Sequence, residues 1–330
     1  MGSLKFGVNL LPYGVPYSRL LEATLKAEEL GFDSVWLPDH LQRNSLDVLE
    51  CWSALSALAA QTTKIRLGTS VTCALFRHPS LLAKMGATLD QVSHGRLELG
   101  LGAGYDGTEF SAYGIPFPPL AARTNVLRET VKIVKALWTN SAGVNHDGQF
   151  FRIHSATCQP EPLQKPHPPI WVAGRSRGLL ELAATEADGL NVVPYSGVAE
   201  RRRISSIEDL AALISELDAL CQKEGRMPAE VSKLVYTGDG GVILADNQES
   251  FDSKVERYAK LAAIPPDRLR ERLRTLSILY GSPQQVASEL LELKEAGFDH
   301  VLLQFHGWPS GTYDEMEAFA DKVVTTVRYS

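Results

Sequence analysis

Short segments of uninterrupted apolar residues alternate along the chain with longer segments that carry apolar residues at helical spacing. The short segments predict strands of a parallel sheet covered on both faces, because strands with one face in water alternate apolar and polar residues. The longer segments predict amphipathic helices. The expected strands are Lys5–Asn9, Ser34–Leu37, Ile65–Thr69, Leu97–Leu101, Pro169–Ala173, Gly189–Val193, Val235–Leu244 and His300–Phe305.

Helices are expected in the intervals between these strands, and no change of composition divides the chain. This order favours a (β/α)8 TIM barrel over a doubly wound sheet, and we expect one domain over residues 1–330. Two stretches exceed a minimal barrel and are expected to be insertions, at Thr139–Pro168 and Gln248–Tyr280. The expected helices are Tyr17–Leu30, Val48–Ala60, Ser80–Ser93, Arg123–Trp138, Leu179–Ala187, Ile207–Glu224, Pro283–Ala296 and Glu315–Val327.

Composition narrows the possible functions. A net charge of −6 and a pI near 5.8 provide no basic surface for nucleic acid. No apolar stretch approaches the length of a membrane span, and the N-terminal residues do not resemble a signal peptide. The four cysteines lie far apart and the histidines show no ligand spacing, which argues against metal sites and disulfides. We expect a cytoplasmic protein without a metal.

Catalytic residues of a TIM barrel lie at the carboxyl ends of its strands. Asp39 and His40 follow the second strand, where an acid and an imidazole can hold a ligand and exchange a proton. The alternative is a helix cap and a surface histidine. The third strand is followed by small residues that would let a flat ligand approach the backbone, or would simply form a polar loop: Ser70, Val71, Thr72 and Cys73.

Glycines follow the fourth strand, and residues 102–107 match the pattern G-x-G-x-x-G. That pattern marks a dinucleotide site only when a helix follows at once within the first βαβ unit of a domain. Here three strands precede it, and the prolines at Tyr113–Pro119 exclude an immediate long helix. We reject a Rossmann site, while close approach of a flat ring to these glycines remains possible.

The fifth strand ends in Gly174, Arg175, Ser176 and Arg177, directly before a helix. Free N–H groups at a helix N-terminus, reinforced by two arginines, predict a phosphate site. The alternative to a phosphate site is an ordinary helix cap. Gly174–Gly178 also fits the Gly-x-Ser-x-Gly pattern of a hydrolase, but flanking arginines suit a bound anion better than an activated serine.

Several blocks, in this order and spacing, resemble the luciferase-like monooxygenase superfamily over nearly the whole chain. Asp39-His40 and Glu109-Phe110 belong to the matching positions. The longer matching blocks are Leu30–Trp36, Ile65–Val71, Gly95–Gly104, Tyr113–Phe117, Pro168–Gly174 and Gly297–Val301.

The resemblance implies a TIM barrel that binds FMN or the deazaflavin coenzyme F420 at the strand ends. It implies a ring stacked over a bulge at Ser70–Val71, often with a cis peptide bond there, and lined by Gly104 and Thr108. It places the cofactor phosphate at Gly174–Arg177, in agreement with the helix-terminus argument.

Asp39-His40 and the Gly68–Val71 block look like the F420-dependent branch. The sugar-phosphate dehydrogenases of that branch have a Glu and a Trp where this chain has Tyr105 and Asn44, which argues against sugar-phosphate oxidation. The methylene-tetrahydromethanopterin reductases carry an acid where this chain reads Leu10–Tyr13, which argues against that activity as well.

The resemblance therefore favours an F420-dependent oxidoreductase that transfers a hydride to or from a small organic substrate. His40 is the expected proton donor or acceptor, Asp39 a contact of the cofactor edge, Tyr105 a substrate contact and Glu109 an orienting acid. The alternative is an FMN-dependent monooxygenase that uses reduced flavin from a separate reductase and O₂. A non-catalytic flavin-binding protein is a third class, and a homodimer is expected.

Overall fold

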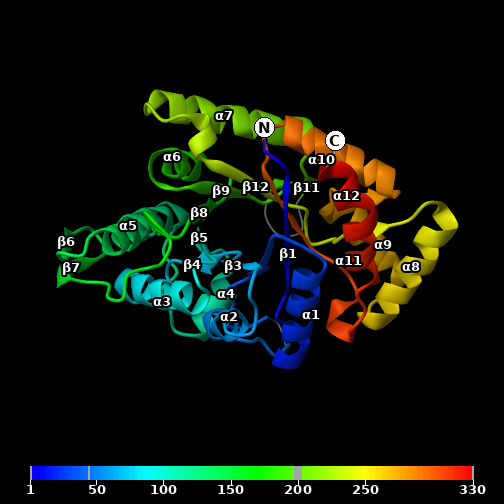
Figure 1. The fold of residues 1–330 in the computed structure, drawn as a ribbon, viewed down its shortest axis with the longest axis horizontal. Coiled ribbons are helices and arrows are strands. Elements are labelled where there is room, and N and C mark those ends of the chain that lie inside the picture. Colours follow the sequence, from blue (N-terminus) through cyan, green and yellow to red (C-terminus); the bar gives the residue numbers. More distant parts are fainter. Residues whose placement is uncertain (1, 44, 197–202, 329–330) are drawn as a thin grey trace.

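The computed structural model describes residues 2–43, 45–196 and 203–328. Eight parallel strands close into a barrel in the order β1-β2-β3-β5-β8-β9-β12-β15, and β15 returns to β1 (Figure 1). The predicted TIM barrel is confirmed. The barrel strands are β1 (Lys5–Asn9), β2 (Ser34–Leu37), β3 (Arg66–Thr69), β5 (Leu97–Gly102), β8 (Ile170–Ala173), β9 (Gly189–Val192), β12 (Ser232–Tyr236) and β15 (His300–Leu303).

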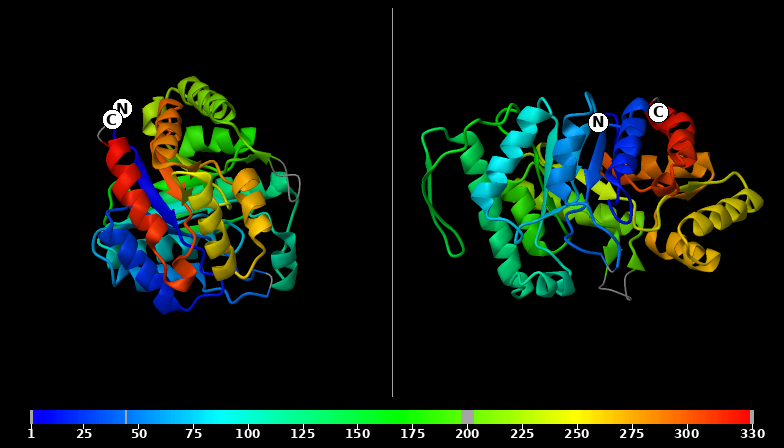
Figure 2. Two further views of the ribbon diagram at one scale, coloured as in Figure 1. Left: turned by 90° about the vertical axis from the view of Figure 1, so that its right-hand side faces the viewer. Right: turned by 90° about the horizontal axis from the view of Figure 1, so that it is seen from below.

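Helices pack around this barrel and bury the outward-facing residues of its strands (Figure 2). Their positions agree with the predicted helices to within a few residues. The helices that follow barrel strands are α1 (Tyr17–Glu29), α2 (Cys51–Ala59), α3 (Pro79–Val92), α5 (Leu120–Thr139), α6 (Arg177–Glu186), α7 (Ile207–Lys223), α10 (Pro283–Glu295), α11 (Asp314–Phe319) and α12 (Thr325–Arg328).

The barrel interior is packed by large side chains that face glycines. The indoles of Trp36 and Trp171 meet edge to face, 5.9 Å between ring centroids, beside Leu234 and Leu302. A Cβ atom on Gly68 would lie 2.3 Å from the Trp36 ring. The glycines of the strands are therefore what makes room for the two indoles, and this layer forms the floor beneath the barrel mouth.

One predicted strand is wrong. Val235–Leu244 was expected to be continuous, but β12 ends at Tyr236 and β13 (Ile243–Leu244) pairs outside the barrel with β14 (Tyr280–Gly281). The sequence Gly-Asp-Gly-Gly at 238–241 interrupts it, with φ of +108° at Gly238 and +76° at Gly241. Such backbone turns leave the extended conformation that a strand requires.

The two expected insertions have defined structures. Thr139–Pro168 contains a hairpin of β6 (Val144–Asp147) and β7 (Arg152–Ala156), which projects from the side of the barrel (Figure 1). Gln248–Tyr280 contains α8 (Gln248–Leu261) and α9 (Pro266–Leu276). These two helices pack on each other and form a lobe at the opposite end of the molecule (Figure 1).

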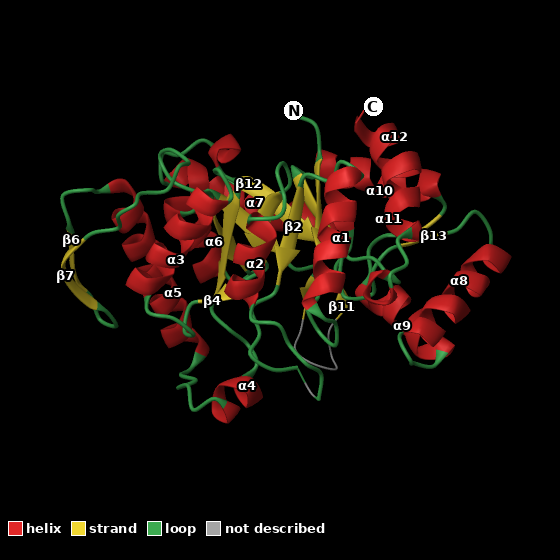
Figure 3. Cartoon of the chain, turned by 60° about the horizontal axis from the view of Figure 1, so that its bottom comes forward, coloured by secondary structure: helices red, strands yellow, loops and turns green. Residues whose placement is uncertain are grey.

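Smaller elements that the sequence did not predict lie around the mouth. A short helix α4 (Gly107–Ala112) follows β5 and stands beyond the carboxyl ends of the strands (Figure 3). β4 (Thr72–Cys73) continues β3 after a break, and β10 (Tyr195–Ser196) pairs with β11 (Arg203–Ile204). No helix among the described residues is long and apolar enough to cross a membrane.

Candidate active site

The predicted site residues lie at the carboxyl ends of four neighbouring barrel strands and in the loops that follow them. Asp39 and His40 follow β2, and Ser70–Cys73 connect β3 to β4. Gly104–Glu109 follow β5 and enter α4, while Gly174–Arg177 connect β8 to α6. Because β2 pairs with β3, and β3 and β8 both pair with β5, these loops share one side of the barrel mouth.

Three of the predicted residues form a hydrogen-bonded chain. Glu109 Oε2 lies 3.0 Å from His40 Nδ1, and Tyr105 Oη lies 3.2 Å from His40 Nε2. Glu109 is buried at the start of α4 and also accepts the backbone N–H groups of Leu41 and, at 3.2 Å, Gln42. These contacts join loops more than sixty residues apart, and the carboxylate fixes the orientation of the imidazole.

Two further side chains flank this chain. The Tyr13 ring meets His40 edge to face, 6.1 Å between ring centroids. Burial raises the pKa of the Tyr13 phenol, which therefore stays protonated near neutral pH. Arg43 Nη1 lies 3.4 Å from Tyr105 Oη and 3.5 Å from Asp106 Oδ2. The sequence had pointed to neither Tyr13 nor Arg43 as part of the site.

Asp39 is held in a way that the sequence did not predict. Its side chain is 0% exposed, and Arg77 binds both carboxylate oxygens at 2.5 and 3.0 Å. The Cys73 N–H donates to the same carboxylate at 3.3 Å, and Arg77 also binds Glu50, the N-cap of α2. Burial raises the pKa of Asp39, and the Arg77 guanidinium opposes that rise. This Asp39–Arg77–Glu50 clamp ties together the loops after β2 and β4.

A bulge separates β3 from β4. The pairing with β5 shifts by one residue between Gly68 and Thr72, and the Ser70–Val71 peptide bond is cis, as the family resemblance implied. Trp52 Nε1, from helix α2, donates a hydrogen bond to Thr72 Oγ1 at 3.1 Å. Burial raises the pKa of Cys73 to about 12, so this thiol stays protonated at neutral pH and does not act as a nucleophile.

Small residues and unpaired polar atoms suit a flat ligand with a polar edge. A Cβ on Gly102 would lie 2.6 Å from Val71, and one on Gly104 would lie 2.9 Å from the Cys73 sulfur. The amide oxygens of Asn9 and Asn191 are buried without a partner at the upper ends of β1 and β9. A buried acceptor without a partner is costly, so a ligand with N–H groups fits this floor. Sequence patterns gave no signal for either asparagine.

The predicted phosphate site has mixed geometry. Ser176 is the N-cap of α6 and makes no side-chain cap bond, and Arg175 donates to Ser205 Oγ at 2.5 Å beside it. Arg177 instead pairs with Glu181 at 2.9 Å and with Glu216 at 2.8 Å. The N-terminus of α6 and Arg175 are thus arranged for an anion, while the Arg177 guanidinium is already paired with two carboxylates.

The remaining predicted contact, Thr108, lies in the first turn of α4. The hydroxyl of Thr108 donates to Asp106 Oδ1 at 2.5 Å, and Asp106 caps α4. Asn44, named in the comparison with sugar-phosphate dehydrogenases, lies outside the described residues. Among the residues that the structure describes, no cluster of three or more His, Cys, Asp or Glu side chains is arranged to hold a metal.

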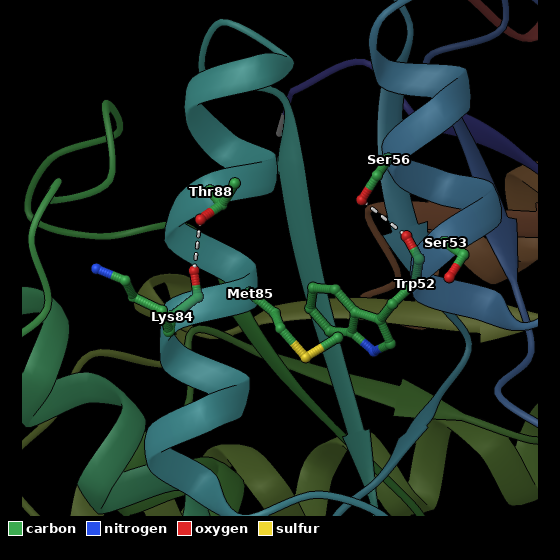
Figure 4. A pocket seen from close by; sticks show the side chains of 6 residues that line it. All are labelled: Trp52, Ser53, Ser56, Lys84, Met85 and Thr88. Atoms are coloured by element: carbon green, nitrogen blue, oxygen red, sulfur yellow. Dashed lines mark hydrogen bonds between the residues drawn. The ribbon is translucent and has the colours of Figure 1, made fainter.

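A separate pocket of about 390 Å³ lies on the outside of the barrel, between α2 and α3 (Figure 4). The Trp52 indole and the Met85 thioether point toward each other across it, and Ser53, Ser56, Lys84 and Thr88 complete its lining (Figure 4). Trp52 joins this pocket to the bulge, because its indole N–H donates to Thr72. The pocket therefore backs onto the candidate site but does not contain it.

Comparisons with known proteins agree with the barrel fold. An F420-dependent glucose-6-phosphate dehydrogenase of Kineococcus radiotolerans is 28% identical, over 98% of this chain and 97% of its own. The oxygenase component of a flavin-dependent trigonelline monooxygenase of Acinetobacter baylyi is 29% identical, over 63% of this chain and 54% of its own. A solved F420-dependent secondary alcohol dehydrogenase, in complex with an F420-acetone adduct, superposes with a TM-score of 0.79 at 21% identity and covers 99% of this chain and 100% of that one.

At that identity the superposition establishes the barrel and not the reaction. The family model for luciferase-like monooxygenases matches residues 4–300, which is nearly the whole chain. The resemblance inferred from the sequence blocks is therefore confirmed, and the chain belongs to the luciferase-like monooxygenase family.

Proposed function

We propose that this protein is an F420-dependent oxidoreductase that transfers a hydride between the deazaflavin and a small alcohol or carbonyl substrate. The main observation behind this proposal is the row of hydrogen bonds Glu109–His40–Tyr105, which brings proton-transfer groups to the barrel mouth beside the Ser70–Val71 bulge. Hydride transfer to or from a carbon–oxygen bond also requires a proton at the oxygen. F420 supplies the hydride chemistry when bound, and the protein supplies the proton and the orientation.

The residues present fit such a cofactor. The ring edge would find hydrogen-bond acceptors in Asn9 and Asn191, and its face would lie against Val71 and the glycines after β5. Ser70, Thr72, Cys73, Gly104 and Thr108 complete this side in our proposal. The phosphate would be held at Gly174–Arg177, chiefly by the N-terminus of α6 and Arg175.

The chain's own residues then divide the work. His40 holds or accepts the proton, Glu109 keeps its Nδ1 side occupied, and Tyr105 contacts the substrate oxygen. The Asp39 carboxylate is fully covered by the Arg77 clamp. We therefore assign Asp39 the role of holding the bulge in place beside the ring, and not a role in proton transfer. The Arg77 side chain is thus a positioning residue for the cofactor site.

The test is a titration of the purified protein with F420 and, separately, with FMN, followed by fluorescence. Tight binding of F420 and reduction of F420 with 2-propanol, cyclohexanol or benzyl alcohol would support the proposal. Glucose 6-phosphate is included as a separate substrate, because Tyr105 argues against it while a curated relative is named for it. Absence of F420 binding would overturn the proposal.

An FMN-dependent monooxygenase is the second candidate, favoured by the likeness to the trigonelline monooxygenase component. Such an enzyme would need reduced FMN from a separate reductase and would consume O₂. Oxygen uptake by the protein with chemically reduced FMN and a substrate, without F420 turnover, would establish this candidate in place of the first.

We further propose a cytoplasmic homodimer that buries the α2–α3 face. Leu81 is 55% exposed and Val92 is 40% exposed on α3, at spacings that place them on one helix face with Met85 and Thr88. An apolar stripe beside the pocket suits a second copy of the chain. Sedimentation should give a dimer for the wild-type protein and a monomer for Leu81→Lys, and a monomeric wild type would refute the assembly.

A further inference from the structure

Both nitrogens of His40 are occupied in the folded protein. Glu109 Oε2 takes Nδ1 at 3.0 Å, and Tyr105 Oη takes Nε2 at 3.2 Å. The His40 side chain is only 12% exposed, whereas Tyr105 is 57% exposed. Of the two residues, Tyr105 is therefore the more accessible to a substrate that enters the mouth.

The hydrogen bonds also define which nitrogen carries the proton. A carboxylate only accepts hydrogen bonds, and Glu109 already accepts two backbone N–H groups on its other oxygen. Nδ1 of the neutral imidazole must then be the protonated nitrogen that donates to Glu109. Nε2 keeps its lone pair and accepts the hydrogen of the Tyr105 hydroxyl.

We propose that Tyr105, and not His40, is the catalytic residue that exchanges the proton with the substrate, with His40 and Glu109 as a relay behind it. This inference rests on the proposed function. In alcohol oxidation the substrate hydroxyl gives its proton to Tyr105 Oη as Tyr105 gives its own proton to His40 Nε2. When bound, F420 would accept the hydride that the substrate carbon loses as its carbonyl bond forms, and carbonyl reduction would run the same transfers in reverse.

The charges around the relay favour this transfer. After it, the imidazolium lies against the buried Glu109 carboxylate, which stabilises the positive charge. Arg43 Nη1, 3.4 Å from Tyr105 Oη, stabilises negative charge that develops on the phenol oxygen during the transfer. Asp106 lies 3.5 Å from the same guanidinium nitrogen and holds Arg43 in this place.

The kinetic test compares Tyr105→Phe with Tyr280→Phe, which removes the hydroxyl of another exposed tyrosine, on β14 outside the barrel. Tyr105→Phe keeps the ring and removes only the proton carrier. We expect its kcat for F420 reduction by the best alcohol of the panel to fall about 10²- to 10⁴-fold, with an unchanged Kd for F420. Tyr280→Phe should match the wild type.

A second readout does not require the cofactor. In unloaded protein with ¹⁵N-labelled histidine, the Nε2 resonance of His40 should move in Tyr105→Phe while Nδ1 stays protonated, and neither should move in Tyr280→Phe. Unchanged kcat in Tyr105→Phe, or an unchanged Nε2 resonance, would overturn the relay alone. Failure of the wild-type protein to bind F420 or oxidise any alcohol would overturn the proposed function, and the relay with it.

Discussion

The Asp39–Arg77–Glu50 clamp allows one quantitative prediction that does not depend on the reaction. In Arg77→Met the apolar stem of the side chain remains, but Asp39 loses both of its charged hydrogen bonds. The carboxylate has no exposed surface and keeps only the Cys73 N–H, at 3.3 Å. Removing one partner of a buried ion pair typically costs about 3–5 kcal/mol, because the other charge stays buried without compensation.

The free energy of unfolding is measured with urea by tryptophan fluorescence, on protein without cofactor. We expect Arg77→Met to lose about 3–5 kcal/mol at neutral pH. The double variant Asp39→Asn with Arg77→Met removes the stranded charge and should recover at least half of the loss. A loss below about 1 kcal/mol, the size of an exposed ion pair, would refute the argument.

The same variant predicts a pH dependence with a definite sign. Burial raises the pKa of Asp39, and Arg77 opposes that rise, so the pKa rises further when Arg77 is removed. A group whose pKa is higher in the folded than in the unfolded state stabilises the folded protein at pH values below its pKa in the unfolded state, about 4 for Asp. This stability is lost as the pH rises through the pKa in the folded state. The defect of Arg77→Met relative to the wild type should therefore grow from acid to neutral pH, and a constant defect would contradict this account.

Three other predictions concern the barrel seam, the relay and the lobe. Gly100→Ala places a Cβ 2.0 Å from a backbone oxygen of β3 and should lower the free energy of urea unfolding by about 1–3 kcal/mol. The control Gly178→Ala, whose Cβ would have its nearest neighbour at 3.8 Å, should not lower it, and equal stabilities of the two variants would contradict this prediction. Glu109→Gln offers an amide N–H to the imidazole in place of an acceptor, and kcat should fall at least about 10²-fold without a change in F420 affinity; full activity would contradict this. Glu315→Gln removes the charge of a buried carboxylate that binds Lys254 of α8 at 2.6 Å. Hydrogen exchange of the backbone amides of α8 should therefore become faster selectively, and unchanged exchange there would contradict this prediction.

The barrel follows from sequence pattern because each of its units is local. Segments such as Val35–Leu37 are apolar throughout, which fits only a strand buried on both faces, and each is followed by an amphipathic helix. The exception, Val235–Leu244, also has a local explanation, since Gly238 and Gly241 have positive φ angles. These glycines are visible in the sequence, but the apolar residues on both sides of them led to the prediction of one continuous strand.

The candidate site was predicted as a set of strand ends and not as a set of contacts. Asp39, His40, Tyr105 and Glu109 were all expected at this rim and lie there, because parallel strands of a barrel bring their carboxyl ends to one rim. Which of them touch was not predictable, since Glu109 and His40 are 69 residues apart and their pairing depends on how α4 turns back over the rim.

By itself, the sequence determined the barrel, the rim on which the candidate site lies and the family to which the chain belongs, because these depend on local pattern and order along the chain. Only the tertiary structure decided the partners of the buried charges. Arg77 looks like any loop arginine in the sequence, yet it covers Asp39, and Arg177 looks like a phosphate ligand, yet it binds two carboxylates. A buried charge needs a compensating partner, but any segment that folding brings within reach can supply it, and distance along the chain does not reveal which one does.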